Sequence, residues 1–300
     1  MADLDLRPLS LGEILDRTFT LYRRNFVLFA GISAISYLLV LALGLAQSIF
    51  FPIIGLQNPT LNQGIYAGGL FTVLSWVVQI LAYLFSQGGT VFAVSDLYLG
   101  RQIGIGESFA RMRGELGSLF GVLFLNSLLV FGPFLACFIA AFIGGAPMLL
   151  LLGFVLLIFP GLYFACRVMV CVPAALLENL GPRSSLERSF TLTKESVGRA
   201  FVIYVLYFIL KFAAAGLLAW PFAFGVISSQ KDPVMFRMWL SLTQVGAFVA
   251  GVLVGPVLTI AAAVYYYDLR VRKEAFDLQF MMNPTGPIAP GTPGVAKTFS

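Results

Sequence analysis

Long apolar stretches alternate with short polar segments along most of the chain. A helix that crosses a bilayer needs about 20 mainly apolar residues, and six stretches meet this requirement. They cover roughly residues 26–50, 70–96, 118–143, 147–177, 200–227 and 239–267. Because six is an even number, the chain returns to the side of the membrane on which it began. The pattern predicts an all-α integral membrane protein with six transmembrane helices.

The composition supports this class of protein. Apolar residues make up 59% of the 300 residues and charged residues 11%, whereas soluble domains carry about 25% charged residues. No linker-like segment interrupts the chain before its Pro- and Gly-rich end. We therefore expect one six-helix transmembrane domain over residues 1–278 and a disordered cytoplasmic tail over 279–300. The opening MADLDLRPLSLGE is polar and does not resemble a secretory signal.

The positive charges indicate which side of the membrane each segment faces. Of the 19 Lys and Arg residues, 15 lie on the side of the termini and two, Lys231 and Arg237, lie on the other side. Arg167 and Lys211 fall inside spans. By the positive-inside rule both termini are expected to be cytoplasmic. The net charge of +5 is explained by this orientation, so no nucleic-acid partner is predicted.

A short phrase recurs in front of the odd-numbered spans. RTFTLYR at 17–23, ESFARMR at 107–113 and RSFTLTK at 188–194 share the order charged residue, Ser or Thr, Phe, three residues, then Lys or Arg. This recurrence, with a period of about 80 to 90 residues, predicts three pseudo-repeats, each made of an interfacial amphipathic helix and two spans. Their approximate bounds are 8–101, 102–183 and 184–278.

The repeated phrase lies on segments whose apolar positions follow one helical face. Ser10 with Glu13, and Ser184 with Glu187, have the spacing of a capping box. Such helices lie in the plane of the membrane interface. They either set the entry angle of each hairpin or form a binding collar for anionic lipid or for a protein partner in the membrane. The expected headgroup contacts are Arg17, Arg23, Arg111, Arg113, Arg188 and Lys194.

The even-numbered spans end in SDLYLGR, LENLGPR and YDLRVRK, and in each a carboxylate precedes a cation by five residues. This spacing predicts three interfacial salt bridges, each between a carboxylate and its own neighbouring cation. The predicted pairs are Asp96 with Arg101, Glu178 with Arg183, and Asp268 with Lys273.

The sequence offers little for catalysis. It contains no histidine, which removes the commonest general base and zinc ligand. Cys137, Cys166 and Cys171 lie in apolar stretches and are expected to be buried, inert thiols. The acids do not cluster as a metal site requires, and no phosphate-binding Gly-x-x-x-x-Gly-Lys loop is present. We therefore predict no catalytic residues, no metal and no cofactor.

Arg167 and Lys211 are the exceptions among the cations. Counted along continuous helices from Glu178 and Arg199, both lie roughly 16 to 18 Å from the cytoplasmic boundary, near the middle of a core of about 30 Å. A charge at that depth costs at least about 2.5 kcal/mol and normally has a partner. The nearby Pro160 in FPGLYF is expected to kink its helix and free backbone carbonyls. The expected partners of the cations are these backbone carbonyls, Asn126, Gln79, water, or an anionic ligand that the protein binds or transports.

Three segments resemble a known family. RPLSLGEILDRTFTLYRRNF, the middle stretch from FPGLYFACRVMVCVPAALLE through GPRSSLERSFTLTK, and YYYDLRVRKEAFDL are similar to bacterial proteins named for the glycerophosphoryl diester phosphodiesterase membrane domain. The resemblance covers nearly the whole chain before the tail. It implies a six-span bacterial inner-membrane protein of unestablished function. The phosphodiesterase part of some relatives uses histidines and acidic metal ligands, and the resemblance carries no catalytic residue over to this chain.

The sequence thus supports two functional hypotheses. The leading one is a non-enzymatic bacterial inner-membrane protein that interacts with lipids or acts as a membrane-embedded interaction or scaffold protein. The alternative is a transporter or channel for an anionic solute or lipid, in which Arg167 and Lys211 line the route. The sequence indicates no oligomeric state.

Overall fold

The computed structural model describes residues 7–57, 61–98, 100–101, 103–144 and 148–274. Six helical segments are long and apolar enough to cross a membrane, which confirms the predicted all-α membrane fold. The predicted tail at 279–300 lies outside the described residues. The elements are α1 (Leu11–Arg24), α2 (Phe26–Gln57), α3 (Leu61–Tyr98), α4 (Ile105–Gly144), α5 (Met148–Leu156), the π-helical turn η1 (Leu157–Gly161), α6 (Leu162–Val168), α7 (Cys171–Leu177), α8 (Pro182–Thr193), α9 (Val197–Leu218), α10 (Trp220–Ser228) and α11 (Pro233–Glu274).

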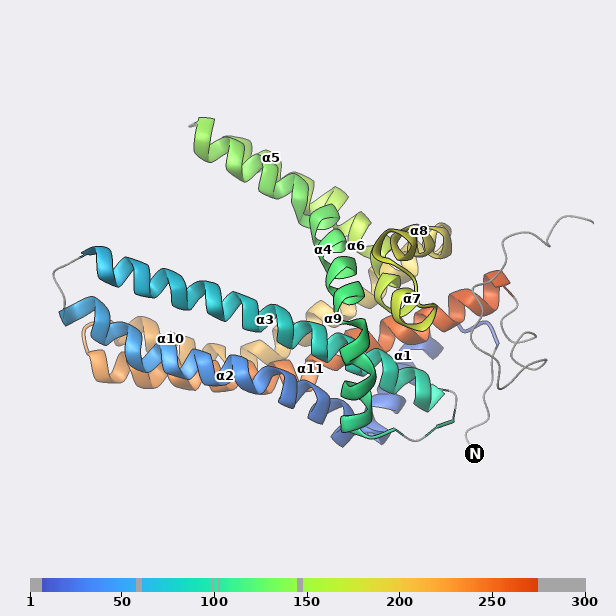
Figure 1. Cartoon of the computed structure of the whole chain (residues 1–300), viewed down its shortest axis with the longest axis horizontal. Helices are drawn as coiled ribbons and strands as arrows, with labels where there is room; N and C mark the ends of the chain where they lie inside the picture. The colour runs from blue at the N-terminus through green and yellow to red at the C-terminus, as the bar shows by residue number, and fades with distance from the viewer. Residues whose placement is uncertain (1–6, 58–60, 99, 102, 145–147, 275–300) are drawn as a thin grey trace, which may run out of the picture.

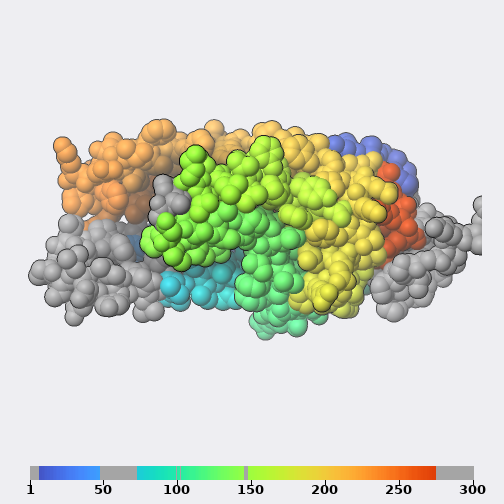
Figure 2. Space-filling view, turned by 90° about the horizontal axis from the view of Figure 1, so that it is seen from above, coloured from blue at the N-terminus to red at the C-terminus, as the bar shows by residue number. Residues whose placement is uncertain are grey.

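The helices are arranged around two distinct ends. In Figure 1, α1, α7 and α8 gather at the right, together with the last turns of α3 and α11. At the left, α2, α3, α10 and the start of α11 run side by side. We call the end that contains α1, α7 and α8 the capped end. The hairpin of α4 and α5 packs on α3 through α4, and Figure 2 shows it lying along one face of the bundle.

The fourth span consists of several helical pieces. Together α5, η1 and α6 contain 21 residues and reach about 31 Å, which already matches a hydrocarbon core of about 30 Å. Met169 and Val170 then form a turn, and α7 follows as a separate helix packed against α3, α4 and α8. The candidate span Met148–Leu177 agrees with the predicted span 147–177, but it is not one continuous helix, and its last part, α7, packs in the capped end.

The core of the protein lies around the last third of α11. Nearly every residue from Val257 to Val271 is buried, including the consecutive residues Tyr265, Tyr266 and Tyr267. A helix that is buried on all sides must be central, and α11 contacts α1, α2, α3, α7, α8 and α9. At 42 residues it is about 63 Å long, so it crosses a bilayer and still extends into the capped end.

The three tyrosine hydroxyls reach three different parts of the capped end. Tyr265 donates to the carbonyl of Ser196 at 2.7 Å, and Tyr266 donates to Glu178 at 2.6 Å. The Tyr267 hydroxyl lies 2.9 Å from that of Ser95. Buried hydroxyls need such partners, so these bonds fix the rotation of α11 within the bundle.

The interfacial helices differ from one another. The predicted capping box of α1 is confirmed, because Ser10 and Glu13 bond each other's backbone N–H. For α8 the predicted box is wrong: Gly181 is the N-cap, and the Ser184 hydroxyl donates to the Gly181 carbonyl at 3.1 Å. The second repeated phrase is not a separate helix, since it forms the first turns of the continuous helix α4. The threefold repeat itself stays a prediction.

Candidate functional site

A cavity of about 500 Å³ lies between the α4–α6 hairpin and the rest of the bundle. Its walls come from α3, α4, η1, α6, α7, α9 and α11. This volume is within the usual range of small-molecule sites, which are mostly apolar with a few polar groups. Within the part of the chain that the structure describes, no Lys, Arg, Asp or Glu lines it. The cavity therefore suits an uncharged ligand or an uncharged part of one.

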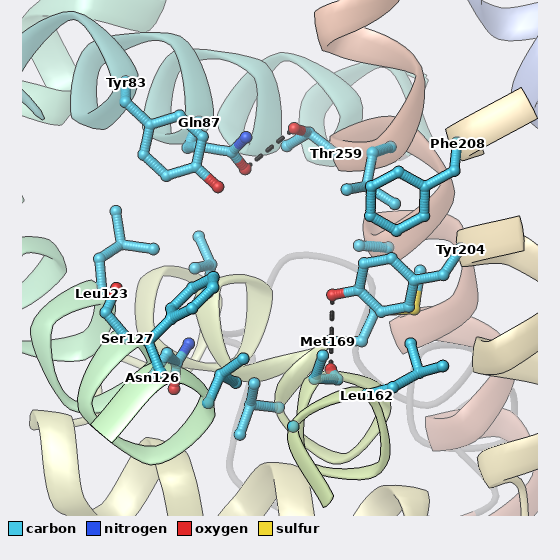
Figure 3. Close-up of a pocket in the computed structure, with 18 of the residues that line it drawn as sticks. Tyr83, Gln87, Leu123, Asn126, Ser127, Leu162, Met169, Tyr204, Phe208 and Thr259 are labelled. Carbon is cyan, nitrogen blue, oxygen red and sulfur yellow. Dashed lines mark hydrogen bonds between the residues drawn. The ribbon is translucent and has the colours of Figure 1, made fainter. Parts of the chain in front are cut away.

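Six uncharged polar side chains face this apolar space from four helices. Figure 3 shows how they are placed around it: one pair bridges α3 and α11, and another group lies across the cavity on α4. They are Tyr83, Gln87, Asn126, Ser127, Tyr204 and Thr259. Within a membrane span such groups are costly unless they have partners. Asn126 was predicted as a possible partner of the buried cations, and the same cost is the signal that points to the other five.

Two hydrogen bonds hold part of this lining in place. The Thr259 hydroxyl donates to the side-chain oxygen of Gln87 at 2.9 Å, and the Tyr204 hydroxyl donates to the carbonyl of Ala165 at 3.4 Å. In contrast, the side-chain oxygen of Asn126 is buried and has no hydrogen-bond partner. A buried polar atom without a hydrogen bond costs about 1–3 kcal/mol, so this oxygen is the energetically least favourable polar atom of the described lining.

The cavity opens sideways toward the apolar surface of the bundle. Phe131 is 54% exposed and Ile158 is 57% exposed, although both line the cavity. Ser127 is exposed as well. Because the surrounding surface is made of large apolar side chains, this opening faces hydrocarbon in a bilayer. A ligand can therefore enter from the membrane.

The predicted helix distortion at Pro160 forms one wall of the cavity. Residues 157–161 make a π-helical turn, which accommodates the N–H that proline lacks. A side chain at Gly161 would meet the carbonyl oxygen of Val130 at 3.2 Å. The absence of a side chain thus lets η1 approach α4 closely at the floor of the cavity.

Arg167 does not line the cavity. Its guanidinium stacks over the ring of Phe190 in α8, with 4.7 Å between the guanidinium carbon and the ring centroid. The residue is 9% exposed, and its Nε has no partner. The freed carbonyl of Arg167 is satisfied instead by the hydroxyls of Ser189 and Thr193, at 2.7 and 3.2 Å. Since α6 ends at Val168 and the turn at Met169 and Val170 follows, the depth counted along a continuous helix stays a prediction.

Lys211 does not line the cavity either. It is exposed on α9, and its ammonium lies 5.9 Å from the ring centroid of Tyr207. An exposed side chain in a span faces lipid in a monomer, where a cation–π contact offsets part of the cost of burial. The structure thus does not bring Arg167 and Lys211 together on one route.

The capped end holds a buried network of two carboxylates and two guanidiniums. Arg188 binds Glu178 through two nitrogens, at 2.9 and 3.0 Å, and also binds Glu274. Arg270 bonds Glu274 at 3.1 Å and lies 3.9 Å from Glu178. The side chains of Glu178 and Arg270 are fully buried. Since the charges balance, the network compensates for their desolvation.

A further buried carboxylate, Asp268, links the segment in front of α1 to the end of α11. Asp268 accepts a hydrogen bond from the backbone N–H of Leu9 at 2.7 Å and pairs with Arg199 and Arg272, at 3.1 and 3.0 Å. The carbonyl of Leu9 accepts bonds from the same two arginines. The segment in front of α1 is thereby fixed against the end of α11.

These contacts correct the predicted salt bridges and headgroup contacts. Asp96, Glu178 and Asp268 are all ion-paired, but not with the predicted cations. Asp96 pairs with Arg111 at 2.7 Å, Glu178 with Arg188, and Asp268 with Arg199 and Arg272. The three cations predicted from the five-residue spacing make other contacts. Arg183 pairs with Glu187 at 3.2 Å, Lys273 donates to the carbonyl of Thr191 at 3.2 Å, and Arg101 bonds the Asp96 carbonyl through its backbone N–H.

Arg188 was predicted to contact headgroups, but only 15% of its side chain is exposed. Burial acts to lower the pKa of its guanidinium, but the hydrogen bonds and charges of Glu274 and Glu178 hold that pKa above its usual value. Arg188 is therefore a permanently charged member of the network. Arg17 is half-buried and donates to the Tyr98 hydroxyl at 3.1 Å. The exposed members of the predicted set are Arg23, Arg111, Arg113 and Lys194.

Other chemistry is limited in the described residues. The three cysteines are free, and Cys166 and Cys171 are buried while Cys137 is half-buried. The described part of the chain contains no group of three potential metal ligands. In comparisons with protein-family models, curated proteins and solved structures, nothing matched this chain.

Proposed function

We propose that this chain is a bacterial inner-membrane protein that binds a lipid or lipid-like amphiphile within its helical bundle. The observation that carries the proposal is the uncharged cavity of about 500 Å³, which opens sideways at Phe131 and Ile158 toward the apolar surface. A ligand that reaches such an opening from the bilayer must itself be soluble in the bilayer. The resemblance to the phosphodiesterase membrane-domain family agrees with a membrane-embedded role.

The orientation follows from the charges. We place the capped end and both termini in the cytoplasm because most of the cations lie on that side. The exposed cations Arg23, Arg113 and Lys194 are then available to anionic headgroups, at about 1 kcal/mol for each cation near the surface. These contacts anchor the protein, and the cavity supplies the specific binding.

We further propose that the protein is not an enzyme. The chain has no histidine, and the cavity lining has no carboxylate in its described residues that could act as a general base. The alternative of an anion transporter or channel rests on Arg167 alone, whose Nε lacks a partner. Lys211 lies on the exposed surface, and neither cation lines the cavity. The geometry therefore favours lipid binding over anion transport.

Native mass spectrometry of the protein in mild detergent tests this proposal. Replacing Ser127, which lines the cavity, with phenylalanine (S127F) should fill the opening and remove a co-purified lipid adduct. Leu128 is the matched control, because it is the next residue of α4, is 54% exposed and does not line the cavity; L128F should keep the adduct. Wild-type protein without an adduct after reconstitution in bacterial lipid, or an equal adduct in S127F, would contradict the proposal.

A further inference from the structure

The cavity lining offers a ligand hydrogen bonds but no charge. None of its described residues is a Lys, Arg, Asp or Glu, and an unpaired ion in an apolar site costs several kcal/mol. A polar group of the ligand that lies in this space is therefore uncharged. Which uncharged group fits depends on the polar atoms of the lining that are free to bond it.

Several polar groups of the lining are satisfied without a ligand. The hydroxyl of Thr259 donates to the side-chain oxygen of Gln87, and the hydroxyl of Tyr204 donates to the carbonyl of Ala165. Ser127 lies on α4, and a serine hydroxyl in a helix can turn to the carbonyl one turn earlier. These groups do not require a particular ligand.

The hydroxyl of Tyr83 differs from these groups. Figure 3 shows it pointing from α3 into the open space of the cavity. It makes no hydrogen bond to any other residue that the structure describes. The oxygen of Gln87, one turn later on α3, accepts from Thr259 instead. The rigid ring also holds the hydroxyl away from the backbone of its own helix, so Tyr83 presents a donor to a ligand in the cavity.

The position of Tyr83 makes this donor costly when it has no acceptor. Tyr83 lies in the candidate span Val73–Tyr98, 13 residues before Asp96, which is about 20 Å along α3 from the charged capped end. The hydrocarbon region supplies no water to bond it, and a donor that leaves water without finding an acceptor costs about 1–3 kcal/mol. A carbonyl oxygen of the ligand removes this cost. It also brings no O–H that would need an acceptor of its own.

We propose that the cavity binds an uncharged lipid through a carbonyl oxygen, which accepts a hydrogen bond from the hydroxyl of Tyr83. This inference rests on the proposed lipid binding and adds the chemistry of the bound group. The apolar chain of the lipid leaves through the sideways opening at Phe131 and Ile158. Glycerol esters and quinones both carry such a carbonyl on an uncharged, bilayer-soluble molecule, so they share the chemistry that Tyr83 recognises.

Competition against a photoreactive ester tests the inference. Full-length protein is reconstituted in nanodiscs of ether-linked phospholipid, because this bilayer contains no ester carbonyl. The protein is labelled with a diazirine-bearing long-chain methyl ester, and the labelled peptides of α3, α4 and α6 are quantified. Methyl hexadecanoate and hexadecane then compete at equal mole fractions in the bilayer. The ester should compete about tenfold better than the alkane, which corresponds to about 1.4 kcal/mol and to one hydrogen bond.

Three further competitors test the charge and identify the source of the carbonyl. Hexadecanoate should compete less well than its methyl ester, because the lining has no counter-ion in its described residues. A diacylglycerol and a decyl-substituted benzoquinone are compared with each other. At least one of them should compete as well as methyl hexadecanoate, and the stronger of the two identifies the class of lipid that carries the carbonyl.

Two variants separate the role of Tyr83 from general effects on the bundle. Y83F removes only the hydroxyl, so it should bring methyl hexadecanoate down to the level of hexadecane and leave competition by hexadecane unchanged. Y163F is the matched control, since Tyr163 is a tyrosine of α6 that is 50% exposed and does not line the cavity; it should keep the tenfold preference. The preference of the wild-type protein needs no substitution, so the inference stays testable even if Y83F does not fold.

The outcomes distinguish this inference from the proposed function. Equal competition by methyl hexadecanoate and hexadecane in wild-type protein, or an unchanged preference in Y83F, would overturn the contact with Tyr83 and leave lipid binding intact. Stronger competition by hexadecanoate than by its ester would overturn it in favour of an anionic ligand. Equal labelling of wild-type protein and S127F would show that the probe does not occupy the cavity, and both proposals would then fail.

Discussion

Glu178→Gln (E178Q) perturbs the buried charge network of the capped end without changing the size of the side chain. Glu178 and Arg270 have no exposed side-chain surface, and Arg188 is only 15% exposed. In wild-type protein the charges of Arg188 and Arg270 are balanced by those of Glu178 and Glu274. The substitution leaves one positive charge in excess, and the glutamine can no longer form the charged two-nitrogen contact with Arg188.

The expected loss in free energy of unfolding is about 3–5 kcal/mol, the usual cost of removing one member of a buried ion pair. This is a large part of the total stability of a typical protein, about 5–15 kcal/mol. Screening by solvent is small, because the carboxylate is fully buried. E187Q is the control, since the Arg183–Glu187 pair has exposed fractions of 91% and 68% and should be worth about 0.3–0.5 kcal/mol.

Reversible unfolding in mixed micelles of a mild detergent and sodium dodecyl sulfate measures these differences. A double-mutant cycle with R270M tests the physical reason, because removing one cation together with Glu178 restores the balance of charge. The double variant E178Q/R270M should be more stable than the sum of the single effects predicts, by at least about 1 kcal/mol. Strict additivity, or an E178Q effect no larger than that of E187Q, would show that charge balance does not stabilise the network.

Two further outcomes follow from the local geometry. Hydrogen bonds from the backbone N–H and hydroxyl of Ser10 lower the pKa of Glu13 from 4.5 to about 2. The capping box should therefore stabilise α1 fully above pH 4.5 and lose this contribution as the pH falls toward 2. A midpoint near pH 4.5 in an NMR titration of Glu13 would contradict this. G246A should reduce the free energy of unfolding by about 1–3 kcal/mol, because its Cβ would lie 1.9 Å from the Leu218 carbonyl oxygen, whereas G251A, with no atom within 4 Å, should not. Equal stability of G246A and G251A in the same micelle assay would contradict the packing argument.

The sequence was sufficient for the parts of the fold that depend on local physics. The bilayer requires long apolar helices, so the six spans follow from hydrophobic length alone. The capping box at Ser10 and Glu13 was also predictable, because all of its atoms lie within one turn. The box at Ser184 failed because Pro182 starts α8 earlier, and proline is well suited to the first position of a helix.

The partners of the buried charges could not be predicted in the same way. Spacing along the chain shows that Asp96 has a cation five residues later, but the bond forms with Arg111, 15 residues away. The choice depends on how α3 and α4 pack. The contacts of Arg167 were unpredictable for a related reason: its position was counted along a continuous helix, and the turn at Met169 and Val170 interrupts that helix.

This turn also explains why the cavity lies where it does. Gln87, Met169 and Thr259 each stand nine residues before Asp96, Glu178 and Asp268, so the predicted repeat places them at equivalent positions, and all three line the cavity. In the first and third units these positions lie in continuous helices, α3 and α11, and their side chains bond each other. In the second unit the helix stops at this position, and η1 lies within the same span. The cavity therefore lies where the predicted second unit departs from the geometry of the other two predicted units.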